Sequence, residues 1–241
     1  MERIARVKQQ GGVCISKDYG ATWNPLNGLP RVPCTSIISV SGPPFTLYAA
    51  MFTKGIYISR DRGITWTLMN EGLDHGNPHV FTLYPGSDGS VFLVVTGRRE
   101  DDKLEPPGGL YKLEQSSKTW ECLTKNLLPL WPVECAAHPN RSGVIFLSVL
   151  AHKGNEGGLF RTLDGGKNWK RVLNGPKGCF SVTVTKDFVW ATLPQNTNNR
   201  NGLYISRDLG ETWDSVPGPV SYTHLRAHET SLHLVCRLLL E

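Results

Sequence analysis

The sequence predicts an all-β protein, a β-propeller fragment of four complete four-stranded antiparallel blades preceded by a partial N-terminal blade. Three observations lead to this fold class. An eight-residue pattern recurs along the chain, tryptophans close its copies at intervals of 43 to 54 residues, and short apolar or alternating segments fill the intervals. A repeat of this period is typical of a propeller blade made of four strands.

The recurring pattern, here called the box, is a hydroxyl residue, then aspartate two positions on, glycine two further on and tryptophan three beyond that. Four copies are complete, at 16–23, 59–66, 162–169 and 206–213, and a fifth at 113–120 keeps only its Thr-Trp end. The residues that define the boxes are Ser16, Asp18, Gly20, Trp23, Ser59, Asp61, Gly63, Trp66, Trp120, Thr162, Asp164, Gly166, Trp169, Ser206, Asp208, Gly210 and Trp213.

These residue types suit a tight hairpin between the third and fourth strands of a blade. The aspartate accepts hydrogen bonds from the turn, the hydroxyl adds a local bond, and the glycine takes a positive φ. The tryptophan begins the fourth strand and covers the junction with its neighbours. We expect Trp66 and Trp213 to contribute more stability than Trp120, because Gln115 and Ser117 replace the aspartate and glycine of the degenerate copy.

Short segments rich in Val, Ile, Phe and Tyr, separated by Gly, Pro, Asn or Asp, supply the strands in order. The partial blade has strands at 12–15 and 21–24. The first complete blade has strands at 35–41, 46–52, 55–59 and 64–69. The second has strands at 79–84, 90–96, 109–113 and 118–123. The third has strands at 133–138, 144–150, 159–162 and 168–172. The fourth has strands at 179–185, 188–192, 203–206 and 212–216.

Two regions differ in origin. Residues 1–219 are expected to form the partial propeller, whose first blade begins at its third strand. Residues 220–241 include VSYTHLRAHET and HLVCRLLLE, which resemble a translated sequencing adapter, so we interpret them as a non-native tail. The alternative for this tail is a short amphipathic C-terminal helix.

Composition narrows the function. The net charge is only +5 and the basic residues are scattered, which argues against nucleic acid as a partner. No apolar run is long enough to span a membrane. The remaining cysteines (Cys14, Cys34, Cys122, Cys135 and Cys179) lack metal-binding spacing and are interpreted as small buried residues, although a Cys122–Cys135 pair is possible. We expect no cofactor and no metal site.

The boxes resemble the Asp-box, or BNR, repeat of sialidases, sortilin-type receptors, xyloglucan-cleaving glycosidases and photosystem II assembly-factor propellers. The resemblance covers nearly all of residues 11–217. The phrase GGLFRTLDGGKNWKRV at 157–172 and the GLP at 28–30 are most similar to bacterial Asp-box propellers described as glycosyl-hydrolase-like. The resemblance implies the fold strongly and the function weakly, because these relatives do unrelated work on one scaffold.

The resemblance also implies that ligands meet the face opposite the box hairpins, where loops join second to third strands and one blade to the next. Long loops on that face are candidate binding regions. The ligand-binding candidates there are Arg98, Arg99, Trp131, His152, Asn199 and Arg200. The catalytic candidates are the carboxylates Asp101, Asp102, Glu105 and Glu156, chosen by position alone. Trp131 could stack on a sugar or pack beneath its loop.

The first interpretation is therefore a non-catalytic Asp-box scaffold that binds a protein partner or a glycan through these loops. The alternative is a fragment of a glycoside hydrolase, sialidase-like or xyloglucanase-like, that acts through paired carboxylates. Arg31-Val32-Pro33 only faintly resembles the Arg-Ile-Pro motif of sialidases, and it follows a box instead of preceding one. An extracellular or periplasmic parent protein is favoured.

Overall fold

A computed structural model describes residues 11–40, 45–73, 78–97, 99–100, 103–104, 108–127, 130–152, 156–194 and 202–216. Every regular element in these residues is a β-strand. Residues 217–241, and with them the whole interpreted tail, lie outside the described part of the chain. The all-β fold class predicted from the repeat is confirmed.

Four antiparallel sheets of four strands each form the blades. The first blade contains β3 (Cys34–Val40), β4 (Thr46–Met51), β5 (Gly55–Ser59) and β6 (Thr67–Leu68). The second contains β7 (Val80–Pro85), β8 (Val91–Val95), β11 (Gly109–Leu113) and β12 (Glu121–Cys122). The third contains β13 (Trp131–Ala137), β14 (Ile145–Leu150), β15 (Gly158–Thr162) and β16 (Lys170–Asn174). The fourth contains β17 (Ser181–Val184), β18 (Val189–Thr192), β19 (Leu203–Ser206) and β20 (Asp214–Ser215).

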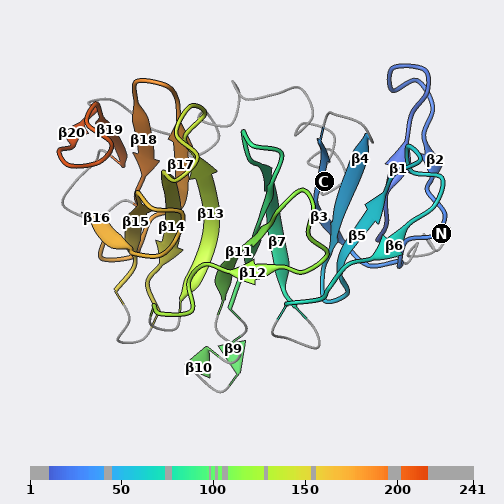
Figure 1. Ribbon diagram of the computed structural model, residues 1–241, viewed down its shortest axis with the longest axis horizontal. Coiled ribbons are helices and arrows are strands. Elements are labelled where there is room, and N and C mark those ends of the chain that lie inside the picture. The colour runs from blue at the N-terminus through green and yellow to red at the C-terminus, as the bar shows by residue number, and fades with distance from the viewer. Residues whose placement is uncertain are drawn as a thin grey trace, which may run out of the picture.

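Two smaller sheets complete the described structure. A partial blade precedes the others, in which β1 (Cys14–Ile15) pairs with β2 (Asn24–Pro25). A second hairpin, β9 (Arg99–Glu100) with β10 (Lys103–Leu104), lies within the loop that joins β8 to β11. The sequence had indicated only a long loop there. In Figure 1 this hairpin projects beyond the blades.

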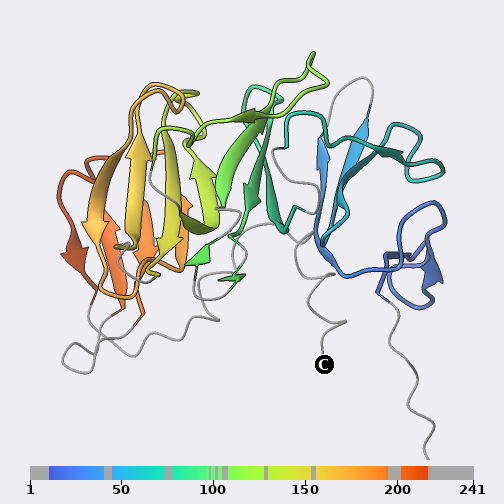
Figure 2. The same ribbon diagram turned by 90° about the horizontal axis from the view of Figure 1, so that it is seen from below.

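The blades stand side by side in chain order, from the blue N-terminal sheets to the red C-terminal sheet (Figures 1 and 2). The first strands β3, β7, β13 and β17 contact one another in succession, so they form the inner edge of the array. The outer edge is made of β6, β12, β16 and β20, each of which pairs only with the third strand of its own blade. This is the radial order of strands in a propeller blade.

The box aspartate closes each complete box by the same set of hydrogen bonds. In the second box, the Ser59 hydroxyl donates to Asp61 (2.8 Å) and accepts from the backbone N–H of Gly63 (2.7 Å). Both the backbone N–H and the hydroxyl of Thr65 donate to Asp61, at 2.9 and 2.5 Å. The boxes at 16–23, 162–169 and 206–213 repeat these bonds. The predicted local chemistry of the box is therefore confirmed.

The turn of the box needs two consecutive residues with positive φ. The glycine was expected to take this conformation, and Gly63 and Gly210 both have φ of 88°. The residue before the glycine does so too, with φ of 61° at Arg62 and 58° at Leu209. Left-handed backbone at a residue with a side chain is costly, so the aspartate bonds offset strain within each hairpin.

Two of the box tryptophans, Trp120 and Trp169, bond to the preceding blade. Each directly precedes its outer strand instead of beginning it. The indole N–H of Trp120 donates to the carbonyl of Met69 in the first blade (2.9 Å), and that of Trp169 donates to Leu123 in the second blade (3.0 Å). Each bond connects the start of one outer strand to the end of the preceding one. Trp66 and Trp213 donate instead to the glycine of their own box.

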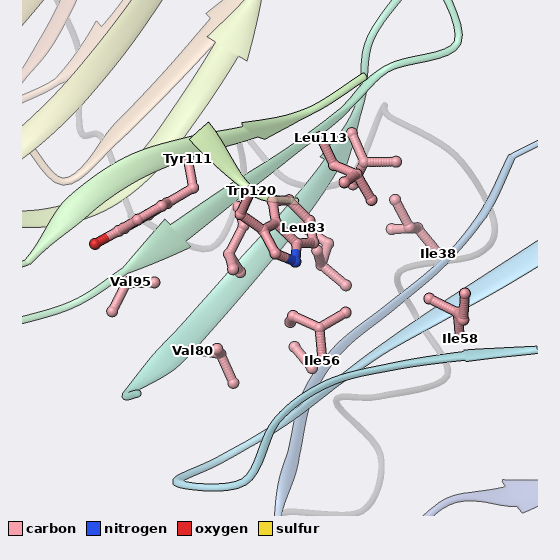
Figure 3. Packing of buried hydrophobic residues seen from close by; sticks show 12 residues of the cluster. Ile38, Ile56, Ile58, Val80, Leu83, Val95, Tyr111, Leu113 and Trp120 are labelled. Atoms are coloured by element: carbon pink, nitrogen blue, oxygen red, sulfur yellow. The ribbon is translucent and has the colours of Figure 1, made fainter. Parts of the chain in front are cut away.

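Three apolar cores lie between successive blades. Between the first and second blades, Ile38, Ile56 and Ile58 face Val80, Leu83 and Trp120 (Figure 3). Corresponding cores follow between the second and third and between the third and fourth blades. The last of these interfaces also has a buried charge: Arg161, 5% exposed, donates to the Leu209 carbonyl and to Glu211 of the next blade, both at 2.6 Å.

All five cysteines within residues 1–219 are free, so the possible Cys122–Cys135 pair is wrong. The thiols of Cys135 and Cys179 are buried, as the interpretation of small buried residues requires. Cys14, Cys34 and Cys122 are only partly buried. Burial raises the pKa of Cys179 to about 12, which keeps this thiol protonated at neutral pH.

Burial reverses the expected order of the tryptophans. Trp120 is only 2% exposed and lies in the first core, whereas Trp66 and Trp213 are half-buried. This burial argues against the order expected from the degenerate box, because the preceding blade, not the box turn, holds Trp120. We predict that Trp120→Ala lowers the free energy of unfolding by about 3–5 kcal/mol, more than Trp66→Ala or Trp213→Ala. Urea denaturation of the three variants would test this order, and a smaller effect at Trp120 would contradict it.

The box aspartates predict an acid-sensitive fold. Hydrogen bonds from Thr65 and Ser59 lower the pKa of Asp61 from 3.8 to about 2. A lowered folded-state pKa stabilises the fold above the ordinary pKa, and this contribution is lost as the pH falls from about 4 towards 2. Asp61→Asn should therefore have a lower melting temperature than wild type at pH 6. The difference in melting temperature between the two proteins should be smaller at pH 2.5. Asp187→Asn, at an exposed hairpin without box bonds, is the control; an unchanged difference for Asp61→Asn would contradict the prediction.

Candidate functional site

The face opposite the boxes is here called the loop face. Its described residues are 52–54, 69–73, 78–79, 96–97, 99–100, 103–104, 108, 123–127, 130, 151–152, 156–157, 175–178, 193–194 and 202. Antiparallel pairing within each blade brings these connections to one end of the sheets. Six of the predicted site residues (Arg98, Asp101, Asp102, Glu105, Asn199 and Arg200) lie outside the described residues. Arg99 belongs to β9, and only its backbone is described.

Trp131 and His152 form an aromatic pair on the loop face. Trp131 is the first residue of β13 and pairs in register with Leu150, the last residue of β14. His152 follows two residues later, and the two rings meet edge to face with centroids 5.4 Å apart and planes at 69°. Both side chains are half-buried. The structure thus brings together two of the predicted ligand-binding candidates at the open end of one hairpin, one from each arm.

The root of the loop that contains β9 and β10 lies beside Trp131. The backbone N–H of Gly108 donates to the Leu130 carbonyl (2.9 Å), so the second blade's longest loop is fastened to the start of the third blade. Glycine is required at this contact, because a Cβ on Gly108 would lie 2.6 Å from Cδ of Pro132. The segment that includes the candidate acidic residues therefore leaves and rejoins the fold next to the aromatic pair.

Glu156, another catalytic candidate, forms an ion pair with Arg171 on β16. Its side chain is 76% exposed, and β16 is the outermost strand of the third blade. The partner thus lies on the rim side of the blade, away from the inner strands. An exposed pair of this kind contributes little to stability. The proposed catalytic role of Glu156 stays a prediction.

Sequence reasoning missed a second aromatic pair on the same face. Phe52, directly after β4, lies against His79, directly before β7, with ring centroids 4.8 Å apart. Phe81, the second residue of β7, and Phe180, directly before β17, are each 38% exposed. Phe81 occupies a bulge between Val80 and Thr82, where the register shifts. An aromatic residue at the start of an inner strand could have indicated these positions from the sequence, since the inner strands begin at the loop face.

Sequence reasoning also missed a buried carboxylate on the same strand as Trp131. Glu134 on β13 is 7% exposed, accepts a hydrogen bond from the Tyr84 hydroxyl (3.0 Å) and accepts another from the backbone N–H of Val182 (3.1 Å). The sequence placed Glu134 inside a strand without assigning it a role. Because both carboxylate oxygens are engaged by neighbouring blades, its geometry indicates positioning rather than contact with a ligand.

The described part of the chain contains neither a metal-binding cluster nor a membrane-spanning helix. No cluster of three or more His, Cys, Asp or Glu side chains there is arranged to hold a metal ion. No helix in those residues has the length and apolar character needed to cross a bilayer.

Comparison with known proteins supports the repeat and the fold. A family model of the BNR/Asp-box repeat matches residues 57–68. A xyloglucanase from Paenibacillus sp. is 27% identical over 233 residues, which cover 92% of this chain and 21% of that protein. The structure of a GH74 xyloglucanase from Xanthomonas campestris superposes with a TM-score of 0.63 at 16% identity, covering 84% of this chain and 34% of that chain.

A structure of YCF48 bound to a D1 peptide is also similar, with a TM-score of 0.55 at 17% identity over 84% of this chain and 60% of that chain. The chain therefore has Asp-box repeats and the fold of a β-propeller, as its boxes predicted. It spans about a fifth of the length of the similar Paenibacillus xyloglucanase. Xyloglucanases such as the similar Paenibacillus protein are glycoside hydrolases, the enzyme class of the alternative interpretation.

Proposed function

We propose that the loop face binds a polysaccharide of the xyloglucan class and that the chain is one part of a larger glycoside hydrolase acting on it. The observation that carries this proposal is the Trp131–His152 pair at the inner end of the third blade. The C–H faces of sugar rings pack well against an indole, and an imidazole nearby supplies a polar edge. The sequence similarity to a xyloglucanase supports the choice of polysaccharide.

The remaining loop-face residues fit an extended sugar chain better than a compact ligand. Phe52 and His79 pair at the junction of the first and second blades, and Trp131 lies on the third blade. Aromatic groups spread over successive blades can contact successive sugar units. Binding sites are typically lined by apolar and aromatic side chains with a few polar groups that set orientation.

Hydrolysis would need two carboxylates, about 5–10 Å apart, on either side of the scissile bond. Asp101, Asp102 and Glu105 remain our candidates because the root of their loop is fastened beside Trp131. Glu156 is a weaker candidate, since its ion pair with Arg171 holds it towards the outer strand. A polysaccharide does not cross a membrane unaided, so we further propose that the parent protein works in an extracellular or periplasmic space.

A protein partner is the second candidate. It is favoured by the likeness to YCF48, whose structure contains a bound D1 peptide and of which this chain covers 60%. Aromatic residues are common anchors at protein interfaces as well as in sugar sites. The two functions differ in the ligand that Trp131 should recognise: a soluble xyloglucan in the first case and a peptide segment in the second.

Replacing Trp131 tests the binding proposal. We expect Trp131→Ala to weaken binding of soluble xyloglucan by about tenfold or more, because a well-packed aromatic anchor contributes more than about 1 kcal/mol. Isothermal titration calorimetry measures the affinity directly. Trp23→Ala is the matched control, since Trp23 is 48% exposed on the box face. Equal affinities for wild type and Trp131→Ala would remove the aromatic pair from the site.

Replacing the loop carboxylates separates an enzyme from a binding scaffold. We expect wild type to release reducing ends from xyloglucan, and the triple variant Asp101→Asn, Asp102→Asn, Glu105→Gln to lose at least about a hundredfold of that rate while still binding. Asp187→Asn is the control because Asp187 is exposed in the hairpin between β17 and β18, at the end of the sheets opposite the loop face. Binding without any release of reducing ends by wild type would favour the non-catalytic scaffold instead.

A further inference from the structure

The third blade departs from the repeat on its inner strand. The register of β3 with β4, of β7 with β8 and of β13 with β14 each shifts once near its start. The residue directly after the shift is Ser36 in the first blade, Thr82 in the second and Glu134 in the third. A carboxylate thus occupies a position where the sibling blades have a small hydroxyl side chain.

In the first blade, the hydroxyl at this position bonds to one neighbouring blade. Ser36 accepts a hydrogen bond from the backbone N–H of Leu83 in the next blade (3.2 Å). Glu134 makes the equivalent bond forward, to the N–H of Val182 in the fourth blade (3.1 Å). Its second oxygen accepts from the Tyr84 hydroxyl of the second blade (3.0 Å). One side chain therefore connects three consecutive blades.

Propeller stability alone does not require a carboxylate here. Burying a charged group is costly, and Ser36 makes the forward bond without that cost. The negative charge also acts on its surroundings: after burial, it is a further cause that raises the pKa of the thiols of Cys135 and Cys179. A costly departure from an otherwise repeated pattern is expected where function imposes its own requirement.

The place of Glu134 suggests that requirement. It lies three residues beyond Trp131 on β13, with the register shift between Pro132 and Glu134 separating them. Bulges of this kind re-aim side chains and are common beside functional sites. The blades that Glu134 connects are those that present His79, Trp131 and the segment 175–178 on the loop face.

We infer that Glu134 is a positioning residue, which holds the second, third and fourth blades at the spacing that presents Trp131 to a glycan. This inference rests on the proposed function for the identity of the ligand but not for the positioning itself. Glu134 positions Trp131 indirectly, through its hydrogen bond with Tyr84 of the second blade and its hydrogen bond with Val182 of the fourth blade. Holding a binding group within a fraction of an ångström depends on such supporting contacts.

The test replaces Glu134 by the residue of the first blade. Glu134→Ser should raise the Kd for soluble xyloglucan about tenfold. It should also make Trp131 more accessible to acrylamide. The fluorescence quenching due to Trp131 is the difference between each protein and the same protein that also carries Trp131→Phe. Glu134→Gln should restore both values towards wild type, because an amide can bond to the Tyr84 hydroxyl and the Val182 N–H together. Tyr84→Phe, which removes a single bond, provides a milder variant if Glu134→Ser does not fold.

Ser36→Ala is the matched control, since it removes the equivalent inter-blade bond at a distance from Trp131. We expect it to lower the melting temperature without changing Kd or Trp131 quenching. If Glu134→Ser and Tyr84→Phe behave in the same way as Ser36→Ala, Glu134 is only structural and the inference is overturned. If wild type fails to bind xyloglucan, the proposed function fails, and the quenching measurement still decides the role of Glu134.

Discussion

The closure of every complete box by one aspartate is the constraint on which most of the outer hairpins depend. Within eight residues, the two oxygens of the carboxylate accept hydrogen bonds from a hydroxyl, a backbone N–H and a second polar side chain. These bonds offset the left-handed backbone of the turn and place a tryptophan directly before the outer strand. From there the indole can cover the junction with the preceding blade. Local polar chemistry thereby sets where the apolar cores between blades begin.

Where the repeat breaks, contacts between blades take over. The degenerate box lacks its aspartate, yet Trp120 is the most buried of the box tryptophans because the first blade supplies a carbonyl and an apolar surface. In the third blade, Glu134 bonds to two neighbouring blades, whereas Ser36 at the equivalent position of the first blade bonds to one. The array therefore tolerates the loss of a local motif where burial compensates, and it accepts a buried charge where geometry has to be held.

The two faces of the array differ in regularity. The box face repeats one set of hydrogen bonds in every complete box. The loop face differs from blade to blade: a single aromatic contact at the first junction, a projecting hairpin on the second blade and the Trp131–His152 pair on the third. Such variation on a constant scaffold explains why related propellers share this fold without sharing a ligand.

The sequence by itself determined the blades, their strand order and the box chemistry, because these depend on residues a few positions apart. The strands predicted at 55–59 and 109–113 agree with β5 and β11 to the residue. Only the tertiary structure decided which side chains meet between blades. Trp120 bonds to a carbonyl 51 residues away, and Tyr84 reaches Glu134 across 50 residues. No local pattern encodes such contacts, since they depend on how tightly successive sheets pack and where each inner strand shifts its register.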